Sequence, residues 1–107
     1  METGIIYCCH NIQNGKKYIG QTRRNLQERI EQHIRDSKKS SYRKFYRGAI
    51  KHGWDNFIWG IVEECNHSIL SVREQYWIEH FDTYNFGYNS TLGGEGRIDP
   101  NRCMNFT

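Results

Sequence analysis

The clearest structural signal in this 107-residue chain is Gly4-Ile5-Ile6-Tyr7, followed by Asn14-Gly15 and then by Tyr18-Ile19-Gly20. Two short apolar runs that flank an Asn-Gly dipeptide predict a β-hairpin. If the dipeptide forms a two-residue turn, side-chain alternation places Tyr7 and Tyr18 on the same face. The glycine that ends the second run would lie there too, leaving room for a ligand or another backbone. We therefore expect one face of the hairpin to join the core and the tyrosine face to border a site.

The length of the chain predicts one domain that buries a core without disulfides or metal. No apolar run is long enough to span a membrane, and the first residues do not resemble a signal peptide. The four cysteines have neither zinc-site spacing nor the pattern of a disulfide framework. Unpaired cysteines favour a reducing compartment, so we expect an intracellular location.

Charge is divided unevenly along the chain, although the formal net charge is only +3. Residues 1–52 contain twelve Lys and Arg against four Asp and Glu, whereas residues 53–107 contain three against eight. A basic half beside an acidic half predicts a surface that binds a polyanion next to a carboxylate site, as in an enzyme acting on nucleic acid. Two solvated faces of opposite sign would give the same composition.

A helix is predicted after the hairpin, because Asn25 is a good N-cap and Glu28 follows three residues later. Aliphatic residues at helical spacing would form one buried stripe up to about Asp36. Arg29 and His33, four residues apart, would lie together at the border between that stripe and solvent. Spacing alone favours an exposed arginine and a half-buried histidine over a functional pair.

A second helix with a basic outer face is predicted from Ser40 or Ser41 to Gly53. Its inner face would carry Tyr42, Phe45 or Tyr46, Ala49 and Ile50. Six cations in and before this helix are predicted to contact nucleic acid: Lys38, Lys39, Arg43, Lys44, Arg47 and Lys51. Cations interleaved with aromatic residues are typical of a surface that follows phosphates.

A third strand is predicted at 57–62, where apolar residues on both faces indicate a central position in a small sheet. The next helix, ending near Asp82, places Glu74 in the middle of an apolar stripe. A buried carboxylate must be protonated, paired with a cation or bound to a metal ion. Alternatively, Ser71 and Glu74 form a capping box at the helix start. The spacing supports both interpretations equally.

Six motifs occur in order: G-I-I-Y at 4–7, K-Y-I-G at 17–20, Arg29 with His33, K-H-G at 51–53, R-E-Q-Y-W-I at 73–78 and G-Y-N at 87–89. Together they resemble the GIY-YIG nuclease superfamily, most closely the catalytic domain of its intron-encoded homing endonucleases. No single motif is specific, but six in register at the expected spacing are strong evidence for this resemblance. The resemblance covers about residues 3–96. The expected fold is α/β (α+β), with a small three-stranded antiparallel sheet flanked by about three helices.

The resemblance implies a phosphodiesterase that uses one divalent cation, Mg²⁺ or alternatively Mn²⁺, and cuts double-stranded DNA. Glu74 would be the only protein ligand of that cation, and Arg29 would stabilise charge on the phosphorus in the transition state. Tyr7 would activate the attacking water as a general base, or position it. A free phenol has a pKa of about 10, so the base role needs a nearby cation. Tyr18 would support the water or the scissile phosphate.

Two further residues are carried over from the resemblance, and two features depart from it. His33 would relay a proton or contact phosphate, and Asn89 would brace the site by hydrogen bonding. The G-I-I-Y run has one residue more than the name-giving pattern, so Gly4 is out of register. Some homing relatives carry a further histidine between the first two helices, where this chain has none at 38–42. Tyr42 or a lysine would substitute for it, or the proton relay would be simpler.

Residues 1–92 are expected to form the catalytic domain, and 93–107 a glycine-rich linker or tail that leads toward a DNA-binding region. One alternative is a restriction or repair nuclease with the same catalytic domain. Another is a non-catalytic module that binds nucleic acid on the same fold, which is disfavoured because binding alone does not need a buried carboxylate. The protein would act as a monomer or as a transient dimer on DNA.

Overall fold

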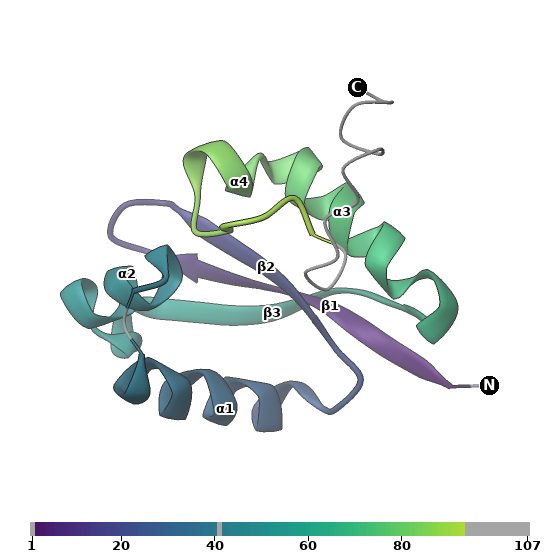
Figure 1. Cartoon of the computed structure of the whole chain (residues 1–107), viewed down its shortest axis with the longest axis horizontal. Coiled ribbons are helices and arrows are strands. Elements are labelled where there is room, and N and C mark those ends of the chain that lie inside the picture. Colours follow the sequence, from purple (N-terminus) through teal and green to yellow (C-terminus); the bar gives the residue numbers. More distant parts are fainter. Residues whose placement is uncertain (1, 41, 94–107) are drawn as a thin grey trace.

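The computed structural model describes residues 2–40 and 42–93, which form a three-stranded antiparallel sheet with helices on both faces (Figure 1). The strands are β1 (Thr3–Asn11), β2 (Lys17–Thr22) and β3 (Phe57–Asn66). The helices are α1 (Leu26–Lys39), α2 (Lys44–His52), α3 (Leu70–Phe81) and the short α4 (Thr83–Phe86). The predicted fold class is confirmed. Within the described ranges, no helix has the length and apolar surface that crossing a bilayer would require.

The hairpin turn is longer than the two-residue turn predicted at Asn14-Gly15. The backbone N–H of Asn11 donates to the carbonyl of Lys16 at 2.9 Å, and that of Gly15 donates to the carbonyl of Asn11 at 2.8 Å. Residues 12–15 therefore form the loop. Gly15 has a φ of 79°, a left-handed conformation that glycine adopts without steric cost.

The register of β1 against β2 nevertheless keeps both tyrosines on one face of the sheet. Tyr7 lies opposite Gly20, and Cys9 lies opposite Tyr18. A two-residue turn would have displaced this pairing by two positions, and an even shift leaves every side chain on its predicted face. The side chain of Tyr7 occupies the space beside Gly20. A Cβ at this position would clash with the ring and hydroxyl of Tyr7. The expected opening for a ligand at Gly20 is therefore wrong.

β1 is the central strand, and the prediction that β3 is central is wrong. The strand order is β2-β1-β3. Ile6 and Tyr7 of β1 point to opposite faces and are both 0% exposed, as a central strand requires. β3 lies at the edge, and its Ile58 and Ile61 are each 59% exposed. An apolar run that indicated burial on both faces therefore belongs to an edge strand.

Two hydrophobic clusters lie on opposite faces of the sheet. The larger cluster is mainly aromatic and contains Tyr7, Cys9, Tyr18, Phe45, Tyr46, Ala49, Phe57 and Tyr88. The smaller cluster lies against α3 and contains Ile6, Ile19, Cys65, Leu70 and Ile78. α1 and α2 cover the tyrosine face, and α3 covers the other (Figure 1). Both faces of the hairpin belong to a core, which corrects the expectation that only one does.

α1 begins as predicted and extends beyond its predicted end. The side chain of Asn25 accepts a hydrogen bond from the backbone N–H of Glu28 at 2.8 Å, and the helix continues to Lys39. The buried residues of α1 are His33 and Ser37, while its aliphatic residues are half-buried. His33 is 0% exposed, so the expectation of a half-buried histidine at the border is wrong.

α2 begins at Lys44, later than predicted, and ends before Gly53 as predicted. Its buried residues are Phe45, Tyr46 and Ala49. Tyr42 precedes the helix and is 69% exposed, and Ile50 is 60% exposed, so both are wrongly assigned to the inner face. Ile50 follows Phe45 by five residues, which places it about 140° around the helix from that side chain.

The segment after α4 packs along the edge of β2. The backbone N–H of Tyr88 donates to the carbonyl of Lys17 at 2.9 Å. The Asn89 side chain donates to the carbonyl of Ile19 at 2.8 Å and accepts from its N–H at 2.9 Å. These bonds satisfy part of an otherwise unpaired edge. Apart from Gly93, the predicted linker at 93–107 lies outside the described residues.

Candidate active site

An open pocket of about 830 Å³ lies beside the edge of β2. Because β2 is an edge strand, side chains from helices on both faces of the sheet reach the same pocket. Four of the predicted site residues line it: Tyr18, Arg29, Glu74 and Asn89. Arg43 also lines it, although the sequence placed that residue among the cations that contact nucleic acid.

Glu74 is the carboxylate that α3 presents to this pocket. It is 7% exposed, and Leu70 and Ile78, one turn to either side, are each 1% exposed, so the predicted burial is confirmed. Its Oε1 accepts a hydrogen bond from Nε2 of Gln21 on β2 at 2.9 Å. The capping-box alternative is wrong, because the helix begins at Leu70 and Ser71 lies inside its first turn.

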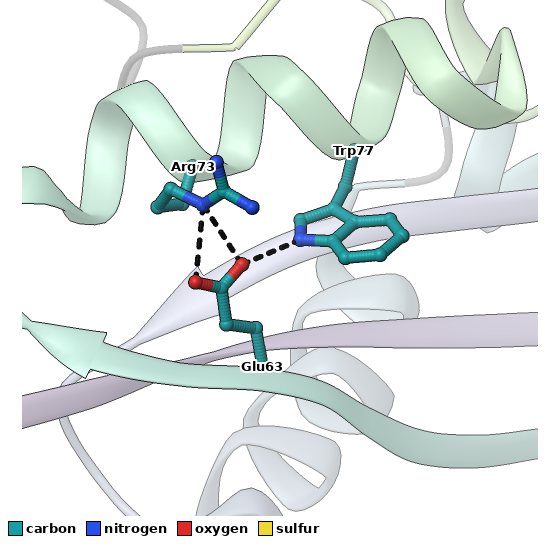
Figure 2. A network of polar contacts seen from close by, with 3 residues as sticks. All are labelled: Glu63, Arg73 and Trp77. Atoms are coloured by element: carbon teal, nitrogen blue, oxygen red, sulfur yellow. Dashed lines mark hydrogen bonds and ion pairs between the residues drawn. The ribbon is translucent and has the colours of Figure 1, made fainter.

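A second carboxylate lies at the other edge of the contact between α3 and the sheet (Figure 2). Glu63 on β3 accepts hydrogen bonds from Nε of Arg73 at 2.9 and 3.0 Å, and from Nε1 of Trp77 at 2.8 Å. The Trp77 bond, followed by the bond and charge of Arg73, holds the pKa of the Glu63 carboxyl below its usual value. Glu63 does not line the described pocket and serves to join α3 to β3.

Arg29 is half-buried in the wall of the pocket and is held at two of its nitrogens. Nε donates to the hydroxyl of Tyr7 at 3.1 Å, and Nη1 donates to Oε1 of Gln32 at 2.9 Å. Spacing alone favoured an exposed arginine because the partner of Arg29, the buried Tyr7, lies on β1, far away in the sequence. The structure thus places Arg29 with the predicted site.

Tyr7 and His33 lie behind the wall of the pocket, and both are 0% exposed. The Tyr7 hydroxyl is 2.7 Å from Nε2 of His33. Burial, and then the neighbouring Tyr18, raise the pKa of Tyr7 well above its usual value, while Arg29 opposes this shift. Burial lowers the pKa of His33 to about 3, helped by the charges of Arg29 and Arg43. Both groups are therefore neutral at pH 7.

Tyr46 joins the site, although the sequence placed it only on the inner face of the helix and among the aromatic residues interleaved with cations. Its hydroxyl is 2.9 Å from Nδ1 of His33 and accepts a hydrogen bond from Nη1 of Arg43 at 3.3 Å. Nη2 of Arg43 donates to the hydroxyl of Tyr18 at 3.3 Å. The spacing of three residues between Arg43 and Tyr46 permits their contact. No pattern in the sequence indicates the bond to Tyr18.

Asn89 lines the pocket while both ends of its amide bind the backbone of β2, as described above. The sequence indicated Tyr88, beside it, only as part of the G-Y-N motif at 87–89. Its hydroxyl accepts hydrogen bonds from the side chains of Asn11 and Asn14 at 3.0 and 3.1 Å. These two residues therefore attach the C-terminal segment to the hairpin and keep that wall of the pocket in place.

The other predicted cations lie outside the pocket. Lys38, Lys39, Arg47 and Lys51 are exposed. Lys44 is half-buried, and its Nζ donates to the backbone carbonyl of Tyr84 at 3.0 Å. The sequence prediction also missed Arg23 and Arg24, which are exposed on the loop after β2 and line the pocket. The only feature of the sequence that could have indicated these two arginines as site residues is their position shortly after the Y-I-G motif.

Comparison with known proteins identifies the family of this chain. Residues 3–89 match the family model of the GIY-YIG catalytic domain. Two curated relatives come from Invertebrate iridescent virus 6. Putative MSV199 domain-containing protein 146R is 30% identical over 95 residues, which are 89% of this chain and 38% of that protein. Uncharacterized protein 019R is 28% identical over 94 residues, which are 88% of this chain and 33% of that protein. The chain thus spans about a third to two fifths of these relatives' length.

Two solved structures have the same fold. The catalytic domain of intron endonuclease I-TevI, determined as a point mutant, has a TM-score of 0.76 at 29% identity, covering 88% of this chain and 99% of that one. Another structure of the catalytic domain of homing endonuclease I-TevI has a TM-score of 0.72 at 30% identity, covering 82% of this chain and 98% of that one. The chain therefore belongs to the GIY-YIG nuclease family and has the fold of a homing-endonuclease catalytic domain.

Proposed function

We propose that this chain is an endonuclease that depends on a divalent cation and hydrolyses phosphodiester bonds in double-stranded DNA. The observation that carries the proposal is one pocket in which a buried carboxylate, Glu74, is combined with two half-buried arginines, Arg29 and Arg43. Guanidinium groups match the charge and geometry of phosphate oxygens. Membership of the GIY-YIG family supports the nuclease class.

One divalent cation, Mg²⁺ or Mn²⁺, fits the carboxylate of Glu74. The described residues contain no group of three or more His, Cys, Asp or Glu side chains that could enclose a metal ion. Mg²⁺ does not require one, because it keeps several waters and commonly binds through one or two carboxylates together with substrate phosphates. When bound, the cation would neutralise phosphate charge and lower the pKa of a coordinated water.

Arg29 would stabilise the charge that develops on the scissile phosphate. It lines the pocket, and its bonds to Tyr7 and Gln32 hold the guanidinium in one orientation. A charged donor that is already oriented needs little reorganisation when charge develops in the transition state. The same bonds give Tyr7 a function that does not require contact with the substrate.

Tyr18 would meet the attacking water or the scissile phosphate, because it lines the pocket whereas Tyr7 lies behind the pocket wall. A hydroxyl behind the pocket wall fits neither role expected for Tyr7, activating the attacking water or positioning it, so we propose instead that Tyr7 orients Arg29. Burial raises the pKa of its phenol well above the usual value, so the hydroxyl remains protonated near pH 7. His33, neutral and buried, would hold Tyr7 rather than contact phosphate.

The exposed cations near the end of α1 and on α2 would contact the DNA on either side of the cleaved bond, together with Arg23 and Arg24 at the pocket. Each phosphate that such a cation neutralises releases condensed counterions, so binding should weaken steeply as salt increases. This contribution is independent of DNA sequence. A DNA substrate would place the protein inside a cell.

Nicking of supercoiled plasmid tests the proposal. We expect nicked or linear product with Mg²⁺ or Mn²⁺ and none with excess chelator, and we expect Glu74→Gln to be inactive in both metals. A duplex RNA of the same length serves as the matched substrate and should remain intact. Binding of DNA without cleavage in either metal would contradict the proposal and identify a non-catalytic module instead.

A further inference from the structure

Arg43 links two tyrosines through the two ends of one guanidinium. It directly precedes α2, is half-buried and lines the pocket. Nη1 donates to the hydroxyl of Tyr46 and Nη2 to the hydroxyl of Tyr18, each at 3.3 Å. The guanidinium carbon also lies 4.8 Å from the centre of the Tyr46 ring, a distance at which cation–π attraction contributes. An arginine held in this way cannot at the same time extend freely toward a distant phosphate.

The two hydroxyls that Arg43 holds lead to different parts of the site. The Tyr18 hydroxyl belongs to a pocket-lining residue. The Tyr46 hydroxyl is 2.9 Å from Nδ1 of His33, and Nε2 of the same ring is 2.7 Å from the Tyr7 hydroxyl. Tyr7 in turn accepts from Arg29 at 3.1 Å. A continuous chain of hydrogen bonds therefore connects Arg43 to Arg29 through the buried side of the pocket.

We propose that Arg43 is a positioning residue for phosphodiester cleavage, which orients Tyr18 directly and orients Tyr7 and Arg29 through Tyr46 and His33. The inference deepens the proposed function and depends on it. It replaces the expectation that Arg43 only binds DNA as one of several surface cations. Small displacements of an oriented group reduce the rate of a reaction strongly, so a residue without contact to the reacting atoms can control the chemical step.

The fork shape of arginine is needed for this role, and its charge alone is insufficient. Two nitrogens of one planar group reach two hydroxyls on separate elements, Tyr18 on β2 and Tyr46 on α2. Lysine carries the same charge on a single nitrogen and cannot reproduce that fixed pair of bonds. Arg47, one turn further along α2, offers a matched control because it is exposed and donates to the backbone carbonyl of Tyr42.

The test is single-turnover nicking of supercoiled plasmid by the wild-type chain and four variants, with protein in excess. Two quantities are measured: the rate at saturating protein, and the protein concentration that gives half of that rate. Arg43→Ala and Arg43→Lys should each lower the saturating rate by about ten- to a hundred-fold. Arg47→Ala should instead raise the half-saturating concentration. Tyr46→Phe, which keeps all charges, should lower the saturating rate by a smaller factor and leave the half-saturating concentration unchanged.

Circular dichroism at the assay temperature verifies that each variant is folded. If Arg43→Ala is unfolded, Arg43→Lys and Tyr46→Phe decide the question. The inference is wrong if Arg43→Lys cleaves at the wild-type saturating rate, or if Arg43→Ala changes only the half-saturating concentration, as Arg47→Ala does. Absence of cleavage by the folded wild-type chain would overturn the proposed function itself, which separates the two failures.

Discussion

Glu63 and Glu74 lie at the two edges of the contact between α3 and the sheet, and their surroundings differ. Glu63 is bound on both oxygens by Arg73, with a further bond from Trp77, and lies outside the pocket (Figure 2). Glu74 accepts from the neutral amide of Gln21 and faces a pocket that four arginines line. Arg73 and Glu74 are neighbours in the sequence, yet they contact opposite edge strands.

Glu63 shows that a carboxylate bound between α3 and the sheet does not by itself indicate a catalytic function. Glu63 pairs with a cation on the neighbouring helix, and the pair joins two elements of the fold. Glu74 has a position from which a ligand in the pocket can reach it. Substitutions of these carboxylates and of their neighbours test whether Glu63 contributes only to stability and Glu74 to cleavage.

The largest effect is expected from Glu74→Gln. Loss of the carboxylate should remove the cation and lower the cleavage rate by about a thousand-fold or more, since metal-ion stabilisation contributes several kcal/mol. Plasmid nicking measures the rate, while fluorescence anisotropy with labelled duplex should give nearly unchanged DNA binding. Glu63→Gln is the matched control and should cleave at the wild-type rate. Cleavage by Glu74→Gln would remove this residue from the metal site.

Arg29→Ala should have the next largest effect, compared with Arg73→Ala. Removal of a preorganised hydrogen-bond donor that stabilises developing charge lowers the rate of the chemical step by about a hundred- to a thousand-fold. Arg73→Ala removes an arginine that is half-buried like Arg29 but that binds Glu63, outside the pocket. This variant should cleave at the wild-type rate at a temperature where it is folded. Single-turnover nicking distinguishes them. Equal losses for both variants would mean that Arg29 acts through stability.

Tyr7→Phe should slow the single-turnover rate by about a hundred-fold, because Arg29 and His33 lose the hydroxyl that joins them. The same change leaves buried polar groups without a partner and should reduce the free energy of unfolding by about 1–3 kcal/mol. Nicking and urea denaturation measure the two effects. A normal rate would show that the bond from Tyr7 to Arg29 has no part in cleavage.

The smallest effect is expected from Glu63→Gln, and it concerns stability alone. The loss should be about 1 kcal/mol at pH 7, since the pair is partly exposed. The pKa of Glu63 is lowered by folding, so its contribution is present above the carboxyl pKa of the unfolded chain and disappears as the pH falls through the folded value. Thermal unfolding at several pH values should therefore give curves for the two proteins that converge in acid. A constant difference would contradict the assignment.

Much of the fold followed from local patterns. The Asn-Gly turn signal located the hairpin, although not the length of its loop, and alternation placed Tyr7 and Tyr18 on one face. Helical spacing placed Glu74 on a buried stripe, and Asn25 predicted the start of α1. These features depend on residues a few positions apart, where backbone geometry alone sets the direction of each side chain.

Other features depended on contacts between distant segments, and only the tertiary structure decided them. Strand order placed β1 at the centre and β3 at the edge, because one apolar run resembles another until their partners are known. His33 is buried because aromatic residues of four elements, β1, β2, α2 and β3, surround it. Arg43 lines the pocket because the hydroxyls of Tyr18 and Tyr46, which are far apart in the sequence, accept its hydrogen bonds. The amino-acid pattern therefore determined which side of each element faces inward, whereas the three-dimensional packing determined which groups meet there.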